Sequence, residues 1–290
     1  MQPAARPSSL IVCPMHGVAP ASATPGAASV LVNGEPLVLL ADVTACGSVV
    51  AQGASSVLGA QLPAAHLLHA TVDTSIISAG CSPDVFIGGP TFELPTNFKI
   101  EGGAAFQNKL LRDLYFLSQT EQGQKVFGRL ANSGKTVTFR DFADRPFYLE
   151  QQETSFVPPN PDAYGSPSDV VIYYDPDPDV RVVWSETRDV STTTSPQVNL
   201  FHEMVHGMHM AEGDAHPPHE VIPGSDPPYA KEEARTIGDA SEGFGGEDPS
   251  ENALRDELGM PHRRDINTPT TTGPNGHMPG PTDHRPGPSP

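Results

Sequence analysis

The chain has 290 residues, enough for one large domain or two ordinary ones, and a formal net charge of -18. Binding to nucleic acid or to an anionic membrane requires a basic face, so this charge argues against both partners. No run of 18 apolar residues occurs, and the first residues lack a basic stretch followed by a long apolar one. Neither a membrane-spanning helix nor a secretory signal is therefore expected. Three cysteines suit a reduced protein better than a disulfide scaffold.

The first third of the chain contains an internal repeat. Residues 26–31 recur at residues 53–58, an offset of 27, and a third, partial copy occupies residues 80–89. Each copy is a short run rich in β-branched residues and bounded by Gly, Asn or Pro, which predicts a hairpin. A fixed period of this length indicates repeated supersecondary units, so a small all-β unit of equivalent hairpins is expected.

These repeats resemble the PAAR family, the small conical domains that cap the spike of the type VI secretion system. The resemblance rests on Cys-Pro at 13–14, SVLVNGEP at 29–36, Pro-Ala-Ala at 63–65 and GCSPDVFIGG at 80–89. It implies that residues 1–95 bind a VgrG-like trimeric spike protein.

The same resemblance implies a structural zinc ion, because family members commonly hold zinc near the tip with histidines and a cysteine. The chain departs from the family at residues 73–75, which read Asp-Thr-Ser where related sequences usually have His-Gly-Gly. The candidate ligands that carry over are His16, Cys46, His69 and Cys81. The alternative is that these are small buried cysteines and surface histidines that bind no metal.

From residue 104 the pattern changes from strands to helices. Apolar residues recur at helical spacing over residues 106–117 and again over 126–130, so two helices are expected before Asn132. The Asn-Ser-Gly-Lys-Thr sequence at 132–136 lacks the first glycine of a phosphate-binding loop and is expected to be a turn. Strands are expected at residues 137–139, 170–174 and 180–184.

The most informative motif is H-E-x-x-H, formed by His202, Glu203 and His206. Its flanks suit helix ends, with Ser-Pro at 195–196 and Gly213. Residues four apart lie on one helical face, so both imidazoles can bind one zinc ion. Glu203 lies beside them and is expected to act as general base on water, whose pKa zinc lowers, in amide hydrolysis.

A catalytic zinc site normally has three protein ligands, so one more must come from farther along the chain. Glu212 has the metzincin spacing, but His209 stands where those proteins need a glycine. His216 and His219 lie in a proline-rich loop and are expected to be exposed. The acidic pair at 232–233, on a second expected helix, is the better candidate, since only one of two adjacent carboxylates faces the metal.

H-E-x-x-H followed by Glu-Glu-x-Arg-Thr at 232–236 and Glu-Asn-x-x-Arg at 251–255 resembles the bacterial effector zinc metalloproteases related to the clostridial neurotoxin light chains. The resemblance covers about residues 104–266. It implies that Glu233 is the third zinc ligand and that Glu232 steadies one of the histidines from outside the metal.

The same resemblance implies roles for later residues. It places Asn252 and Arg255 near the metal. It also implies that Arg263 or Arg264 stabilises the oxyanion, although neither arginine is followed three positions later by the tyrosine that related enzymes have.

The expected architecture is an α+β two-domain chain with a tail. Residues 1–95 form the small all-β PAAR-like cone, and residues 96–267 form a zincin-like α+β metalloprotease domain. Residues 268–290 are mostly Thr, Pro, Gly and His without large apolar side chains, so a disordered tail is expected.

The expected function is a zinc metalloprotease effector, made in the bacterial cytoplasm without a signal peptide and carried into a target cell on the type VI secretion spike. Its partners would be the spike protein, a protein substrate and an immunity protein. One alternative is a non-enzymatic spike cap or adaptor with a degenerate metalloprotease-like passenger. Another is a housekeeping peptidase with an unrelated β module in front.

Overall fold

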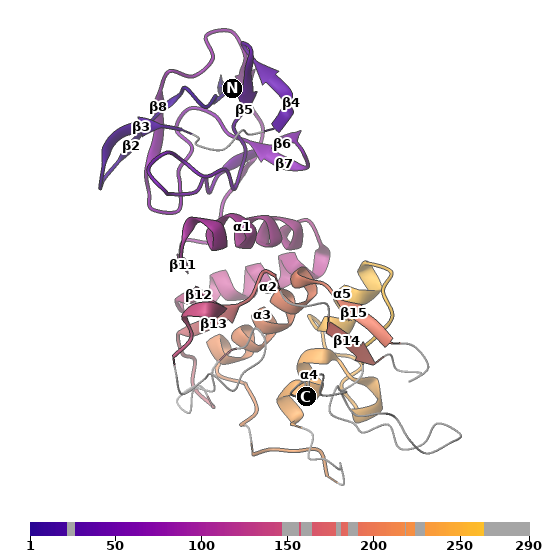
Figure 1. Cartoon of the computed structure of the whole chain (residues 1–290). Coiled ribbons are helices and arrows are strands. Elements are labelled where there is room, and N and C mark those ends of the chain that lie inside the picture. Colours follow the sequence, from indigo (N-terminus) through magenta and orange to yellow (C-terminus); the bar gives the residue numbers. More distant parts are fainter. Residues whose placement is uncertain are drawn as a thin grey trace, which may run out of the picture.

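The computed structural model describes residues 1–21, 27–146, 157, 164–177, 181–184, 191–217, 219–223 and 230–263. Strands dominate the N-terminal part, and helices with a three-stranded sheet form the rest, so the expected α+β architecture is confirmed (Figure 1). The expected tail at residues 268–290 and Arg264 lie outside the described residues. Within the described part, no helix combines the length and apolar composition that crossing a membrane requires.

The N-terminal region is built from short antiparallel pairs. Its strands are β1 (Gln2–Pro3), β2 (Leu10–Cys13), β3 (Gly17–Pro20), β4 (Ala27–Val32), β5 (Glu35–Leu37), β6 (Gly53–Gly59), β7 (Leu62–Ala64), β8 (Ile76–Ala79), β9 (Phe86–Ile87) and β10 (Thr91–Phe92). They form sheets in the orders β3-β2-β8, β10-β6-β7, β4-β5 and β1-β9.

Two of the three repeat copies are hairpins, as predicted. β4 pairs with β5 and β6 pairs with β7, and both pairs are antiparallel. Each turns through two left-handed residues, Asn33 and Gly34 with φ of 54° and 84°, and Ala60 and Gln61 with φ of 48° and 66°. Two positive φ angles give a turn whose twist matches that of the flanking strands.

The third copy differs from the other two. Its strand β9 pairs with β1 at the start of the chain instead of with a following strand. Gly88, Gly89 and Pro90 follow β9 directly, and a proline has no N–H to donate to a ladder. The repeat therefore ends there, and the N-terminus supplies the missing strand.

The second region contains, among its described residues, a parallel sheet and five α-helices. The sheet has the order β11-β12-β13, with Phe98 opposite Val137 and Val137 opposite Val170. Its elements are β11 (Phe98–Glu101), α1 (Ala104–Ser118), α2 (Glu121–Asn132), β12 (Val137–Asp141), a 3-10 turn (Phe142–Asp144), β13 (Val170–Tyr174), β14 (Arg181–Trp184), β15 (Ser191–Thr194), α3 (Pro196–Glu212), α4 (Lys231–Ile237), a 3-10 turn (Ala240–Glu242) and α5 (Glu251–Glu257). β14 and β15 pair with each other as a separate hairpin. The sequence did not predict β11, which is only four residues long.

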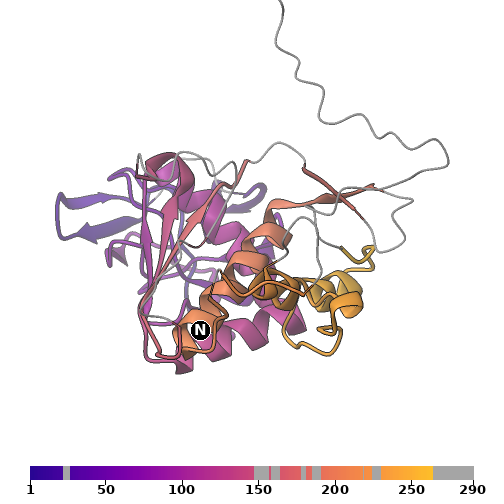
Figure 2. The ribbon, with the colours of Figure 1, turned by 90° about the horizontal axis from the view of Figure 1, so that it is seen from below.

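Helix α1 belongs to both cores. Leu110 and Leu114 lie in the core formed with the parallel sheet and α3, whereas Leu111 and Tyr115 lie in a core formed with the N-terminal strands. In Figure 1, α1 lies between the N-terminal strands and the remaining helices. Figure 2 shows the β2–β3 hairpin and α5 at opposite ends of the molecule. The two regions therefore share one helix.

Candidate metal centre

Helix α3 is fixed in place at both ends and along its length. Ser195 Oγ accepts a hydrogen bond from the N–H of Val198 at 3.3 Å, and Gly213 ends the helix with a left-handed φ of 79°. Gly207 faces the sheet so closely that an added Cβ would lie 3.0 Å from the Val170 side chain. Most of the helix is buried, so the face that carries the two motif histidines has a defined orientation.

Three side chains from α3 and α4 converge on one point. His202 Nε2 and His206 Nε2 are 3.1 Å apart, and His206 Nε2 lies 3.1 Å from Glu233 Oε2. His202 Nε2 lies 3.4 Å from Glu233 Oε1. Four ligands around zinc at 2.0–2.1 Å are separated by about 3.3 Å, so the three donors match that spacing.

The hydrogen-bond partners of the two rings fix their tautomers. His202 Nδ1 lies 2.8 Å from Glu251 Oε2, and His206 Nδ1 lies 3.3 Å from Glu232 Oε1. A carboxylate accepts hydrogen bonds, so each Nδ1 carries the proton and each Nε2 presents a lone pair to Glu233. Lone pairs and a carboxylate that face one another need a cation between them. The donor set therefore fits a zinc ion.

The same carboxylates affect the protonation of the rings. Burial lowers the pKa of His202 and His206, but the charge of Glu233 and the hydrogen bonds that the rings donate to nearby carboxylates outweigh it and raise both pKa values. The centre thus attracts positive charge, for which a proton and a metal ion compete.

Glu203, the acidic residue of the motif, is 6 % exposed. Burial raises the pKa of its carboxyl group to about 6, although the charges of His202 and His206 act in the opposite direction. A carboxyl group with a pKa near neutrality is suited to exchanging protons.

Glu251 was missed by the sequence analysis as a site residue. Its side chain is fully buried, and its carboxylate accepts hydrogen bonds from Arg255 Nε and Arg263 Nη1, both at 2.7 Å, besides contacting His202. Burial raises the pKa of Glu251, but Arg263 and His202 outweigh it and hold the pKa well below its usual range. The signal was present in the Glu-Asn-x-x-Arg segment, where Glu251 resembled an ordinary acid in the first turn of a helix.

The other expected site residues surround Glu251. The Asn252 side chain bonds the backbone of Arg263 twice, to its C=O at 2.9 Å and from its N–H at 2.7 Å. Arg255 is fully buried and also donates to Pro261 O at 3.2 Å. Arg263 bridges two carboxylates, since its Nη2 lies 3.3 Å from Glu233 Oε1. Its charge therefore faces a candidate metal ligand.

The alternative third ligands lie elsewhere. Glu212 accepts hydrogen bonds from Arg129, one of them from Nε at 2.7 Å. His216 Nδ1 lies 3.0 Å from Glu220 Oε2, and His219 is exposed. None of the three belongs to the group that His202 and His206 form among the described residues.

A second group of potential ligands lies in the N-terminal region, where Cys13, His16 and Cys46 have ligand atoms within 4.8 Å of one another. Cys13 Sγ lies 3.4 Å from His16 Nδ1 and 3.8 Å from Asp73 Oδ2. Cys46 Sγ lies 3.2 Å from Thr44 Oγ1. Two of the four expected tip ligands are thus together, with Cys13 added.

The other two expected tip ligands are outside this group. His69 stacks on His66 with ring centroids 3.5 Å apart, and burial lowers the pKa of His69 to about 3. The Cys81 thiol donates a weak hydrogen bond to Ala79 O at 3.9 Å. Cys13 was not predicted as a metal ligand, because the sequence indicated only that its Cys-Pro pair matches the PAAR family.

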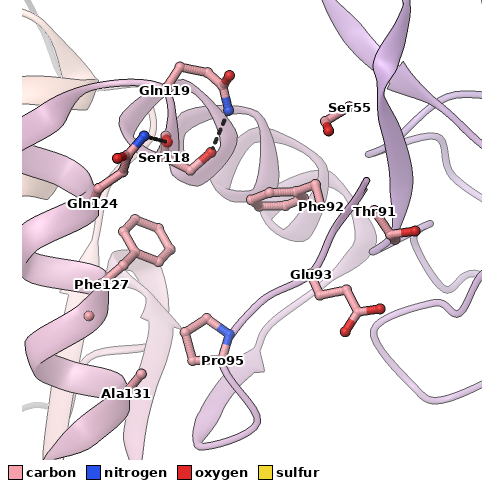
Figure 3. Close-up of a pocket in the computed structure, with 11 residues that line it drawn as sticks. Ser55, Thr91, Phe92, Glu93, Pro95, Ser118, Gln119, Gln124, Phe127 and Ala131 are labelled. Carbon is pink, nitrogen blue, oxygen red and sulfur yellow. Dashed lines mark hydrogen bonds between the residues drawn. The ribbon is translucent and has the colours of Figure 1, made fainter. Parts of the chain in front are cut away.

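A separate cavity of about 460 Å³ lies where the two regions meet, between β10 and helices α1 and α2 (Figure 3). Phe92 and Phe127 provide aromatic surface, and Glu93 is its one acidic lining residue. At its rim Gln119 and Gln124 donate hydrogen bonds to Ser118. None of the residues at the convergence point of α3 and α4 lines this cavity.

Comparisons with known proteins assign both regions. The Peptidase_M91 family model, described as "Effector protein", matches residues 95–265, and the PAAR motif model matches residues 1–52. No curated protein sequence matches the chain. Among solved structures, the botulinum neurotoxin type D light chain is similar with a TM-score of 0.37 and 14% identity. The match covers 53% of this chain and 47% of that one, so this chain spans less than half of that protein's length.

Proposed function

Because the chain belongs to the Peptidase_M91 family of effector proteins and carries a PAAR motif, we propose that it is a zinc-dependent endopeptidase delivered on a type VI secretion spike. It is made in the bacterial cytoplasm and cleaves a protein of the target cell. The observation that carries the zinc part of the proposal is the convergence of His202, His206 and Glu233 with both Nδ1 atoms facing carboxylates.

His202, His206 and Glu233 would hold the metal. When bound there, zinc would lower the pKa of water and polarise a substrate carbonyl. Glu203 takes the proton from the attacking water and later donates it to the leaving amine. Its pKa of about 6 suits both steps, because the group is a base at neutral pH and a competent acid once protonated.

Arg263, which lies within the described residues, is a candidate for balancing the negative charge that develops on the substrate. Its Nη2 lies 3.3 Å from Glu233 Oε1, and its Nη1 lies 2.7 Å from Glu251. A guanidinium held at two points costs little to reorganise during the reaction. Arg264 stays an alternative for the same role.

Docking to a trimeric spike protein is supported by three repeated apolar side chains. Leu31, Leu58 and Val85 occur at intervals of 27 residues and are 61%, 51% and 37% exposed. Exposed apolar side chains at equivalent positions of three repeats suit a partner that offers the same surface three times. The three aspartate substitutions L31D, L58D and V85D together should abolish co-purification of the full chain with the spike protein.

Cys13, His16 and Cys46 would hold a structural metal ion in the spike-binding region. Two thiols and an imidazole are zinc ligands, and Cys13 Sγ and His16 Nδ1 are 3.4 Å apart, close to the spacing around zinc. An immunity protein that blocks the peptidase in the producing cell completes the set of proposed partners.

Glu203→Gln tests the enzyme proposal. The amide keeps the size of the side chain but cannot accept the proton, so peptide cleavage should fall about 100- to 10,000-fold. Bound zinc should be unchanged, which elemental analysis of the same preparation checks. Glu212→Gln is the matched control, because Glu212 contacts Arg129 and not the centre. Equal cleavage by the Glu203 variant and the unmodified protein would favour a non-enzymatic spike cap.

A further inference from the structure

His209 has no part in the proposed reaction, although it lies one turn after His206 on α3. Its side chain is almost fully buried, with 1% of the residue exposed. Its Nδ1 lies 2.6 Å from Glu232 Oε1, the same oxygen that lies 3.3 Å from His206 Nδ1. One carboxylate oxygen thus contacts two imidazoles.

Three elements hold the Glu232 carboxylate. His209 on α3 makes its shortest contact, the N–H of His216 donates to Oε2 at 2.8 Å, and Thr236 Oγ1 on α4 lies 3.4 Å from Oε1. Only 12% of the Glu232 side chain is exposed. A buried carboxylate is stable only with such partners, so its position depends on them.

From this geometry we infer that His209 is a positioning residue for the metal centre, an inference that rests on the proposed function. His209 holds Glu232, and Glu232, together with the Thr236 hydroxyl at 3.1 Å, keeps the proton of His206 on Nδ1. The Nε2 lone pair of His206 is thereby directed toward His202 and Glu233. Residues outside the ligand set commonly fix ring orientation in this way, and their loss weakens metal binding.

Two substitutions separate positioning from simple space filling. His209→Phe keeps a buried ring but removes the donor, whereas His209→Asn keeps an N–H donor near the position of Nδ1 and loses ring volume. In the full chain, zinc affinity measured by competition with a chromophoric chelator should fall about 10- to 100-fold for His209→Phe. His209→Asn should stay within about threefold of the unmodified protein, because its donor preserves the outer contact.

A purely structural role predicts the opposite order. If ring volume is what matters, His209→Asn has the lower melting temperature and the weaker zinc binding, and the inference is overturned. Equal zinc affinity in all three proteins overturns it as well. His216→Ala is the matched control, because the backbone N–H of His216, and not its ring, contacts Glu232. Its zinc affinity should not change.

Failure of the proposed function gives a different result. In that case the unmodified chain itself binds no zinc at the α3 centre, so Glu233→Gln leaves the metal content unchanged. If the unmodified chain binds zinc there and His209→Phe binds it equally well, only the positioning role of His209 is wrong.

Discussion

Two buried acids, one in each region of the molecule, differ in the partners that compensate their charge. Glu251 in the helical region is fully buried against two arginines and an imidazole, which hold its pKa well below its usual range despite burial. Asp42 in the N-terminal region is 5% exposed and accepts a hydrogen bond from the N–H of Leu39 at 2.9 Å. Burial there raises the pKa to about 6, against the smaller effects of that bond and of Arg112. The partners of Glu251 therefore outweigh its burial, whereas those of Asp42 do not; Glu203 in the helical region resembles Asp42 in this respect, because burial raises its pKa as well.

The two candidate metal groups also differ in how charged partners surround their ligands. In the helical region each histidine contacts a carboxylate at Nδ1, the fully buried Glu251 for His202 and the partly buried Glu232 for His206, and Arg263 contacts Glu233. At the N-terminal group, Cys46 Sγ lies 3.2 Å from the uncharged hydroxyl of Thr44. A catalytic centre needs fixed, polarised donors, whereas a structural site needs mainly the right ligands at the right spacing.

The largest expected effect comes from replacing the compensated acid. Glu251→Gln leaves two buried arginines short of a negative partner, so the free energy of unfolding should drop by about 3–5 kcal/mol. Urea denaturation of the full chain measures this change. Glu101→Gln is the control, since its exposed pair with Arg140 is worth less than about 1 kcal/mol. If Glu251→Gln lowers the free energy of unfolding no more than Glu101→Gln does, the buried charge of Glu251 is not specially stabilised and the contrast with Asp42 is lost.

The shared helix α1 gives the next effect. Leu110 and Leu111 are both fully buried but face different cores, so each change to alanine should cost about 2–5 kcal/mol. Because one helix serves both cores, calorimetry should show a single unfolding transition that both variants lower. Two transitions, each shifted by only one variant, would mean that the regions unfold independently.

Replacing Asp42 is expected to change the free energy of unfolding in the opposite direction, because no partner of this acid outweighs its burial. Since the folded pKa of Asp42 is about 6 and that of an unfolded aspartate is about 3.9, the folded state binds more protons between these values. The proton bound to Asp42 therefore stabilises the folded state fully below pH 4, and this stabilisation is lost as pH rises through 6. Asp42→Asn should therefore raise the free energy of unfolding at pH 7.5 by up to about 3 kcal/mol.

Denaturation of this variant at pH 4 provides the internal control, because the difference from the unmodified chain should vanish there. The amide oxygen of the variant can still accept from Leu39. A variant less stable than the unmodified protein at pH 7.5 would show that Asp42 is compensated like Glu251.

The smallest effect on catalysis is expected at the N-terminal group. Cys46→Ser should remove one zinc ion per chain and leave peptide cleavage unchanged, because the group is separate from α3 and α4. Elemental analysis combined with a cleavage assay checks both statements. Cys81→Ser, whose thiol contacts Ala79 O, should keep the full metal content. If Cys46→Ser abolishes cleavage, the centre between α3 and α4 depends on the N-terminal metal group, contrary to this prediction.

Local patterns explain which parts of the fold were predictable. The α3 helix was predictable from its cap at Ser195, its proline at 196 and its glycine at 213, all of which act within a few residues. The hairpins of the repeat were predictable for the same reason. β11 and the pairing of β9 with β1 were not, because a short strand gains its stability from a distant partner.

The shared helical face of the two motif imidazoles could be predicted from the residues alone, because a spacing of four residues gives that geometry in any α-helix. The sequence also singled out Glu232 and Glu233 as the acidic pair that meets this face. Two contacts came to light from the packing of the folded chain: Glu251, 49 positions from His202, holds that ring, and Cys13 joins His16 and Cys46. Such contacts depend on how separate elements pack against one another, which no local spacing encodes.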